Sequence, residues 1–267
     1  MPYSTEDLLY LMARLREPGS GCPWDLKQSY ASIAPSTLEE AYEVVDAIER
    51  GDLDHLREEL GDLLFQVIFY SQLGREDERF DFHSIVDGLV EKLLRRHPHV
   101  FPDGTLESRV EDQGSVPDEV KVRWEAIKQQ ERADKGAVGA LDDVPLNLPA
   151  LSRAAKLQKR AAGVGFDWPG VEGPVAKVHE ELKELEETLA SGDREAQQEE
   201  LGDLLFAVAN VARHLKLDPE AALRGASRKF ERRFRYVERQ AGEQLAEHSL
   251  AQLDGYWEDA KRTEKSP

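Results

Sequence analysis

Two groups of acidic side chains, one in each half of the chain, are of the type that binds divalent cations in proteins. Carboxylates held close together repel one another and lose hydration, so such a group usually surrounds a cation. No histidine or cysteine is interleaved with these acids, which favours a hard cation: Mg²⁺ first, with Mn²⁺ as the alternative. Such ions are typically shared with substrate phosphates, so the pattern indicates cleavage of a phosphate ester or anhydride. The first group consists of Glu39, Glu40, Glu43, Glu59 and Asp62, and the second of Glu180, Glu181, Glu184, Glu200 and Asp203.

The repetition of these acids distinguishes them from an ordinary solvated helix face. For any single glutamate, an exposed and charge-rich face is the simpler interpretation. The segment 58–65, however, recurs letter for letter as 199–206, and the other acids of each group keep the same spacing from it. The acids also flank an apolar stripe that includes Leu60 and Leu64. We therefore interpret each group as a metal site, and name them the first and second acidic clusters.

Helical spacing explains how each cluster would assemble. Residues 39, 40 and 43 span about one turn, so their carboxylates lie on one side of a helix, and Glu59 and Asp62 are neighbours in the same way. Between the two sets, Gly51 predicts the end of one helix and Asp52 the N-cap of the next. This short turn makes the helices antiparallel partners, and counting outward from it places the two sets at the same level.

The periodicity of apolar residues predicts helices almost throughout. Ser4 or Thr5 is the expected N-cap of the first helix, and Ser36 or Thr37 is expected to open the helix that carries the first glutamates. No alternating pattern predicts strands. We expect an all-α protein with two tandem antiparallel helical bundles, formed by residues 1–134 and 150–267. A linker is expected at 135–149, where periodicity is lost and glycines and prolines gather.

Composition narrows the partners and the compartment. The 267 residues include 53 acidic and 35 basic ones, for a formal charge of −18, which argues against binding to a nucleic-acid polymer. A single cysteine, Cys22, excludes an intrachain disulfide framework and suits a reducing compartment. No apolar run approaches the length of a membrane span or a signal peptide. We expect a soluble cytoplasmic protein.

Basic and aromatic residues near the clusters are candidates for contact with a nucleotide. Two cationic pairs at helical spacing, one after each cluster, could hold phosphates, or could form surface ion pairs instead. A tryptophan could stack on a base, although in a helical bundle tryptophan is more often part of the core. Asn210 is a weaker candidate for reading a base edge. The candidates for nucleotide binding are Lys92, Arg96, Lys229, Arg233, Trp257 and Asn210.

Taken together, these motifs resemble the MazG family of nucleoside triphosphate pyrophosphohydrolases. The resemblance rests on Glu-Glu-x-x-Glu followed by Glu-x-x-Asp, and extends to segments 22–25, 95–101, 164–168 and 229–234. It implies an all-α, magnesium-dependent homodimer in which helices of two subunits build the site. Such enzymes convert a nucleoside triphosphate to the monophosphate and pyrophosphate, and serve in nucleotide-pool house-cleaning and in the stress response.

The resemblance also assigns roles to residues. Glu39 and Glu180 are candidates for orienting or deprotonating the attacking water, and Lys229 and Arg233 for offsetting charge on the departing pyrophosphate. Family precedent favours the second cluster as the active one. The implied metal ligands are Glu40, Glu43, Glu59 and Asp62 in the first cluster, and Glu181, Glu184, Glu200 and Asp203 in the second.

Three other interpretations remain to be weighed. Phosphoribosyl-ATP pyrophosphohydrolase shares the expected fold but is a short single domain, unlike this duplicated chain. A di-iron carboxylate bundle would need Glu-x-x-His motifs, which neither cluster has. A nucleotide-binding regulatory or scaffold protein, without turnover in one or both halves, is the alternative from a different functional class.

Overall fold

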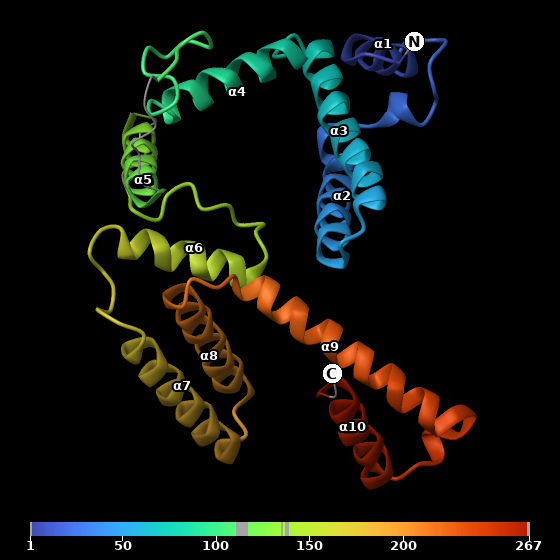
Figure 1. The fold of residues 1–267 in the computed structure, drawn as a ribbon, viewed down its shortest axis with the longest axis vertical. Helices are drawn as coiled ribbons and strands as arrows, with labels where there is room; N and C mark the ends of the chain where they lie inside the picture. The colour runs from blue at the N-terminus through green and yellow to red at the C-terminus, as the bar shows by residue number, and fades with distance from the viewer. Residues whose placement is uncertain (1, 111–116, 135, 137–138, 266–267) are drawn as a thin grey trace. The chain divides into compact units, whose positions relative to one another are not determined.

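The computed structural model describes residues 2–110, 117–134, 136 and 139–265 (Figure 1). Within these residues all regular structure is helical, with ten α-helices and two short 3-10 helices and no β-strand. The expectation of an all-α fold is thereby confirmed. No helix in the described ranges is both long and apolar enough to span a membrane.

The chain divides into two compact units, residues 1–128 and 129–267. The division falls inside helix α5 (Pro117–Asp134). The boundaries expected at 134 and 150 stay predictions.

The first unit is built on an antiparallel helix pair, α2 and α3, with α1 packed against α3 (Figure 1). Its core gathers side chains from all three helices: Met12 of α1, Ile33 of α2, and Ile68, Phe69 and Leu73 of α3. The elements of this unit are α1 (Thr5–Leu15), η1 (Asp25–Lys27), α2 (Tyr30–Arg50), α3 (Leu53–Glu76), α4 (Phe82–Arg96) and most of α5.

The turn between α2 and α3 has the predicted chemistry. Gly51 ends α2 in the left-handed conformation, with φ of 71°, which a side chain would disfavour. Asp52 caps α3, where its carboxylate accepts a hydrogen bond of 3.1 Å from the backbone N–H of His55. These two residues turn the chain back on itself, and so fix which levels of the two helices face each other.

Helix α2 begins earlier than the sequence pattern predicts. Its N-cap is Ser29, paired with Ser32 in a capping box, and not Ser36 or Thr37. The helix passes through Pro35, which lacks an N–H and so loses one backbone hydrogen bond. The capping box satisfies the free N–H groups at the true start, and Thr37 instead donates its hydroxyl to the carbonyl of Ile33.

The second unit repeats this plan. Helices α7 and α8 form its antiparallel pair, α6 packs against α8, and α9 pairs with α10 (Figure 1). Gly192, with φ of 69°, ends α7, and Asp193 caps α8 as Asp52 caps α3. The elements are α6 (Ala150–Ala162), α7 (Glu172–Ser191), α8 (Arg194–His214), α9 (Pro219–Ala241), η2 (Gly242–Glu247) and α10 (Leu250–Lys265).

Candidate metal and substrate site

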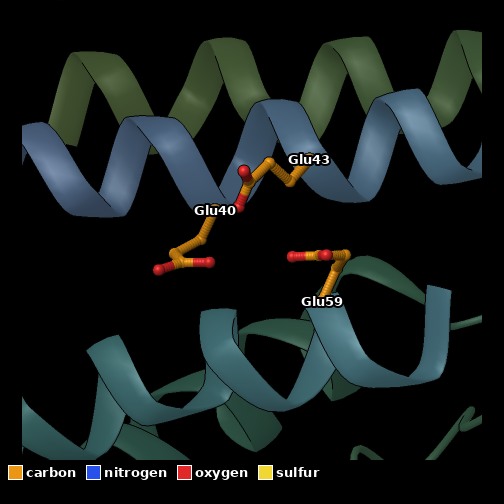
Figure 2. A group of neighbouring side chains, drawn as sticks. All are labelled: Glu40, Glu43 and Glu59. Carbon is orange, nitrogen blue, oxygen red and sulfur yellow. The ribbon is translucent and has the colours of Figure 1, made fainter. Parts of the chain in front are cut away.

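The first acidic cluster assembles across the α2/α3 pair. Glu40 and Glu43 extend from α2 toward Glu59 of α3 (Figure 2). Each of the three offers a carboxylate oxygen, and these oxygens lie within 4.8 Å of one another. Glu59 is buried at 7% exposure, whereas Glu43 is exposed. The structure thus brings together acids that are distant in sequence, at the level that the turn length predicted.

The second acidic cluster assembles in the same way across α7 and α8. Glu181 and Glu184 of α7 meet Glu200 of α8, again with carboxylate oxygens within 4.8 Å of one another. Glu181 is the buried member, at 4% exposure. Three oxygen donors converge here from two rigid helices, an arrangement that can hold a hard cation while leaving positions for water or phosphate.

The two aspartates lie close enough to act on these glutamates electrostatically. Burial, followed by the negative charge of Asp62, raises the pKa of Glu40. Burial and then the charges of Glu181 and Asp203 raise the pKa of Glu200. Asp62 and Asp203, one turn after Glu59 and Glu200, therefore lie near the converging glutamates but outside the groups whose oxygens meet within 4.8 Å, and their role as metal ligands stays a prediction.

Both clusters hold carboxylates that resist ionisation. Burial and then the neighbouring acid, Glu43 for Glu59 and Glu181 for Glu184, raise the pKa of Glu59 and of Glu184. Losing water and facing like charges both disfavour the ionised form. A divalent cation among these side chains would reverse the sign of the local field and remove that penalty.

Each cluster contains a basic side chain that the sequence analysis missed. In the first cluster the Nε2 atom of His55 lies 3.0 Å from Glu59. In the second, the Nζ atom of Lys177 lies 2.5 Å from Glu181 and 2.9 Å from Glu180, and hydrogen bonding to these carboxylates raises the lysine pKa. Each base precedes its buried glutamate by four residues on the same helix, a spacing that the sequence already displayed.

The two bases occupy different positions in the repeat. Ser36 stands where the second copy has Lys177, and Ala196 stands where the first copy has His55. The acids are therefore duplicated, whereas the cations that compensate them are not.

The predicted phosphate-binding cations lie on other helices. Arg233 of α9 donates to Glu264 of α10 at 2.9 Å, and its guanidinium lies 5.8 Å from the ring centre of Trp257. Lys229 is exposed on α9, while Lys92 and Arg96 lie on α4. Contact of these residues with a nucleotide stays a prediction.

Asn210, the candidate for reading a base, is buried on α8 at 6% exposure. Its amide oxygen accepts a hydrogen bond of 2.8 Å from Arg213. The amide oxygen of Asn210 is thus bonded within the second unit. A role for Asn210 in base recognition stays a prediction.

Fold and site together define a class: an all-α protein in which each half presents facing carboxylates suited to a hard cation. The MazG nucleotide pyrophosphohydrolase domain matches the chain twice, over residues 28–101 and 171–237. The chain therefore belongs to the MazG family, and the resemblance drawn from its motifs is confirmed. Each matched span contains one complete acidic cluster.

Two relatives of similar length align with nearly the whole chain, and a third aligns with part of it. The nucleoside triphosphate pyrophosphohydrolase of Escherichia coli strain K12 is 52% identical, over 96% of this chain and 97% of that protein. The nucleoside triphosphate pyrophosphohydrolase/pyrophosphatase MazG of Thermotoga maritima is 44% identical, over 96% and 95%. The nucleoside triphosphate pyrophosphohydrolase of Mycobacterium tuberculosis is 37% identical over 60% of this chain and 45% of that protein.

Proposed function

We propose that this protein hydrolyses ribo- or deoxyribonucleoside triphosphates to the monophosphate and pyrophosphate, through attack of water at the α-phosphorus. The observation that carries the proposal is the convergence of Glu181, Glu184 and Glu200 within 4.8 Å, each from a helix fixed by its partner. Relatives of matching length that are named for this activity support it.

The donor set of each cluster fits a hard cation. Carboxylate oxygens are ligands that Mg²⁺ prefers, and Mn²⁺ is the natural substitute. Burial and then neighbouring carboxylates raise the pKa of Glu184 and of Glu200, and a bound cation would offset this repulsion. When bound, such an ion supplies charge neutralisation for the polyphosphate and acidifies water. The residues that would hold it are Glu181, Glu184, Glu200 and Asp203 in the second cluster, and Glu40, Glu43, Glu59 and Asp62 in the first.

The chain's own groups account for the proton and for the leaving group. Glu180 is exposed at the edge of the second cluster and held by Lys177, so it can orient the attacking water and accept its proton. The new bond joins the water oxygen to the α-phosphorus. The bond between the α-phosphorus and the α,β-bridging oxygen breaks, and that oxygen leaves with the pyrophosphate. Lys229 and Arg233 are proposed to offset the charge that develops on the departing pyrophosphate. Glu39 has the role of Glu180 in the first copy.

The second cluster is proposed as the main catalytic site. It contains Lys177, whose ammonium group lies among the carboxylates and adds a positive charge that a polyphosphate would meet. The first copy has Ser36 at that position and supplies His55 instead. We assign the first copy a regulatory or dimerisation role, or a weaker activity.

Exposed apolar residues beside both clusters support assembly as a homodimer. Leu60 and Leu64 of α3 are 49% and 43% exposed, and their repeats Leu201 and Leu205 of α8 are both 48% exposed. Leucine stripes of this kind next to a binding site are typical of surfaces that another chain covers. In a homodimer, helices of the partner would close the open side of each cluster.

We further propose that the enzyme acts in the cytoplasm, on nucleotide pools and in the stress response.

One experiment tests the reaction directly. Purified protein is incubated with each common (d)NTP, with and without Mg²⁺, and the products are separated. Monophosphate plus pyrophosphate, formed only with the metal, is the expected result. Diphosphate plus orthophosphate would place attack at the γ-phosphorus and contradict the proposal. Nucleotide binding without turnover would favour the regulatory or scaffold alternative.

A further inference from the structure

Trp168 precedes α7, the helix that carries Glu181 and Glu184 of the second cluster, and its side chain packs against the backbone of the first turn. Its indole ring packs against Gly173, in the first turn of α7. A Cβ atom placed on Gly173 would lie 2.1 Å from Cδ1 of the indole, so the position tolerates no side chain while the ring stays in place. Trp168 nevertheless remains 42% exposed. The ring is therefore fixed on one side and open on another.

The residue before it anchors this tryptophan to α8. The carboxylate of Asp167 accepts a hydrogen bond of 2.9 Å from Nη1 of Arg213, and Nε2 of His214 lies 3.0 Å away. Asp167 also accepts a bond of 2.9 Å from the backbone N–H of Trp168. The loop is thus tied to both helices that carry the second cluster.

The indole, the lysine and the acids follow one another along one face of α7. Gly173, Lys177 and Glu181 are four residues apart, a spacing that places them on the same side of the helix. At a rise of 1.5 Å per residue, Gly173 and Glu181 are separated by about 12 Å along the axis. This is comparable to the length of a nucleotide from its base to its phosphates.

We propose that Trp168 is the stacking surface for the base of the nucleotide whose phosphates meet Lys177 and the second acidic cluster. The inference rests on the proposed function, and adds to it the residue that binds the nucleoside end of the substrate. Every base has a π-face, so stacking on an indole strengthens binding with little preference among bases. Trp168 therefore provides affinity for nucleotides as a class.

The arrangement is confined to the second copy. Ser32 and Ser36 occupy the positions that correspond to Gly173 and Lys177 in the repeat. The first copy thus lacks both the bare backbone that receives the ring and the lysine that follows it.

Binding of two triphosphate ligands, one with a nucleoside and one without, tests the proposal. The full-length protein is titrated calorimetrically, in Mg²⁺, with a non-hydrolysable α,β-methylene nucleoside triphosphate and with inorganic tripolyphosphate. Trp168→Ala should weaken binding of the nucleotide analogue about tenfold and leave the affinity for tripolyphosphate unchanged. Trp168→Phe should restore most of the loss, because a phenyl ring still stacks.

Two further variants separate stacking from loop integrity. Gly173→Ala keeps the indole but displaces it, so it should reproduce the Trp168→Ala result. Phe166→Ala removes an aromatic side chain that is 79% exposed in the same loop, and should bind both ligands as the wild type does.

The outcomes distinguish this inference from the proposed function. Equal losses of analogue and tripolyphosphate affinity in Trp168→Ala, or no loss at all, would overturn the stacking role. Wild-type protein that binds the analogue through Trp168 yet never releases pyrophosphate would refute the proposed reaction and leave the base-binding residue in place.

Discussion

Lys177 lies one helical turn before Glu181, and its ammonium nitrogen is 2.5 Å from the glutamate carboxylate. This contact places a positive charge from the chain itself inside the second acidic cluster. It also reaches Glu180, the candidate for handling the attacking water. The second cluster is therefore partly neutralised by its own chain before substrate arrives.

Removing this lysine should destabilise the metal-free protein. The raised pKa of Lys177 means that its stabilising contribution is fully present below the unfolded-state pKa, near 10.4, and is lost only at more alkaline pH. Lys177→Gln should lower the free energy of unfolding by up to about 1 kcal/mol at pH 7.5 in EDTA, since the pair is partly exposed. Thermal denaturation measures this. Lys183→Gln, which removes a more exposed pair with Glu187 on the same helix, should change nothing measurable; an equal effect of both variants would contradict the assignment.

Turnover should depend on the second cluster. Glu184→Gln and Asp203→Asn should each reduce pyrophosphate release by at least about 10²-fold while helix content, measured by circular dichroism, is unchanged. Glu187→Gln is the control, because this exposed glutamate lies on α7 outside the cluster. Glu43→Gln should leave most of the activity. If Glu184→Gln and Asp203→Asn both remain active, the second cluster is not the catalyst.

The clusters should make stability depend on pH and metal in a defined direction. The folded-state pKa of Glu184 is raised, so the folded protein holds this proton longer than the unfolded chain does, and folding is penalised as pH rises above the unfolded value, near 4.3. In EDTA, Glu184→Gln should therefore melt at a higher temperature than wild type at pH 7.5 and at the same temperature at pH 4. Mg²⁺ should raise the melting temperature of the wild type at pH 7.5 only. A metal effect of the same size at pH 4 would count against carboxylate ligands.

The ion pair of Asp167 should report on acid stability. Hydrogen bonding to Arg213 lowers the pKa of Asp167 to about 2. The pair therefore stabilises the fold above the unfolded value of about 4, and this contribution is lost as pH falls from about 4 to about 2. Asp167→Asn should cost about 1 kcal/mol at pH 7 and much less at pH 2, measured by urea denaturation. If the loss in free energy of unfolding were the same at both pH values, the substitution would act through packing and not through the charge of Asp167.

The exposed leucines should mediate self-association. Leu205→Glu places a charge within the apolar stripe of α8, and should convert a dimer into monomers in sedimentation velocity experiments. Leu250→Glu is the control, since Leu250 is 82% exposed and begins a different helix, α10. A wild-type protein that sediments as a monomer at micromolar concentration would refute the homodimer.

The sequence by itself determined the helices, the duplication and the identity of the acids. Helical periodicity and capping are local properties, so the turn at Gly51 and Asp52 was predictable, and so was the facing of Glu43 and Glu59 across it. The start of α2 was not, because the capping box at Ser29 outweighs the loss of one hydrogen bond at Pro35.

Tertiary structure decided which of the acids are buried. The spacing of Lys177 and His55 from their glutamates is visible in the sequence, but the burial of those glutamates at the seam depends on how α7 and α3 are rotated against their partners, which packing of whole helices sets. The contact of Trp168 with Gly173 depends on a loop anchored by Arg213, a residue far along the chain. Long-range packing of this kind leaves no periodic pattern in the sequence, and so only the folded chain could disclose it.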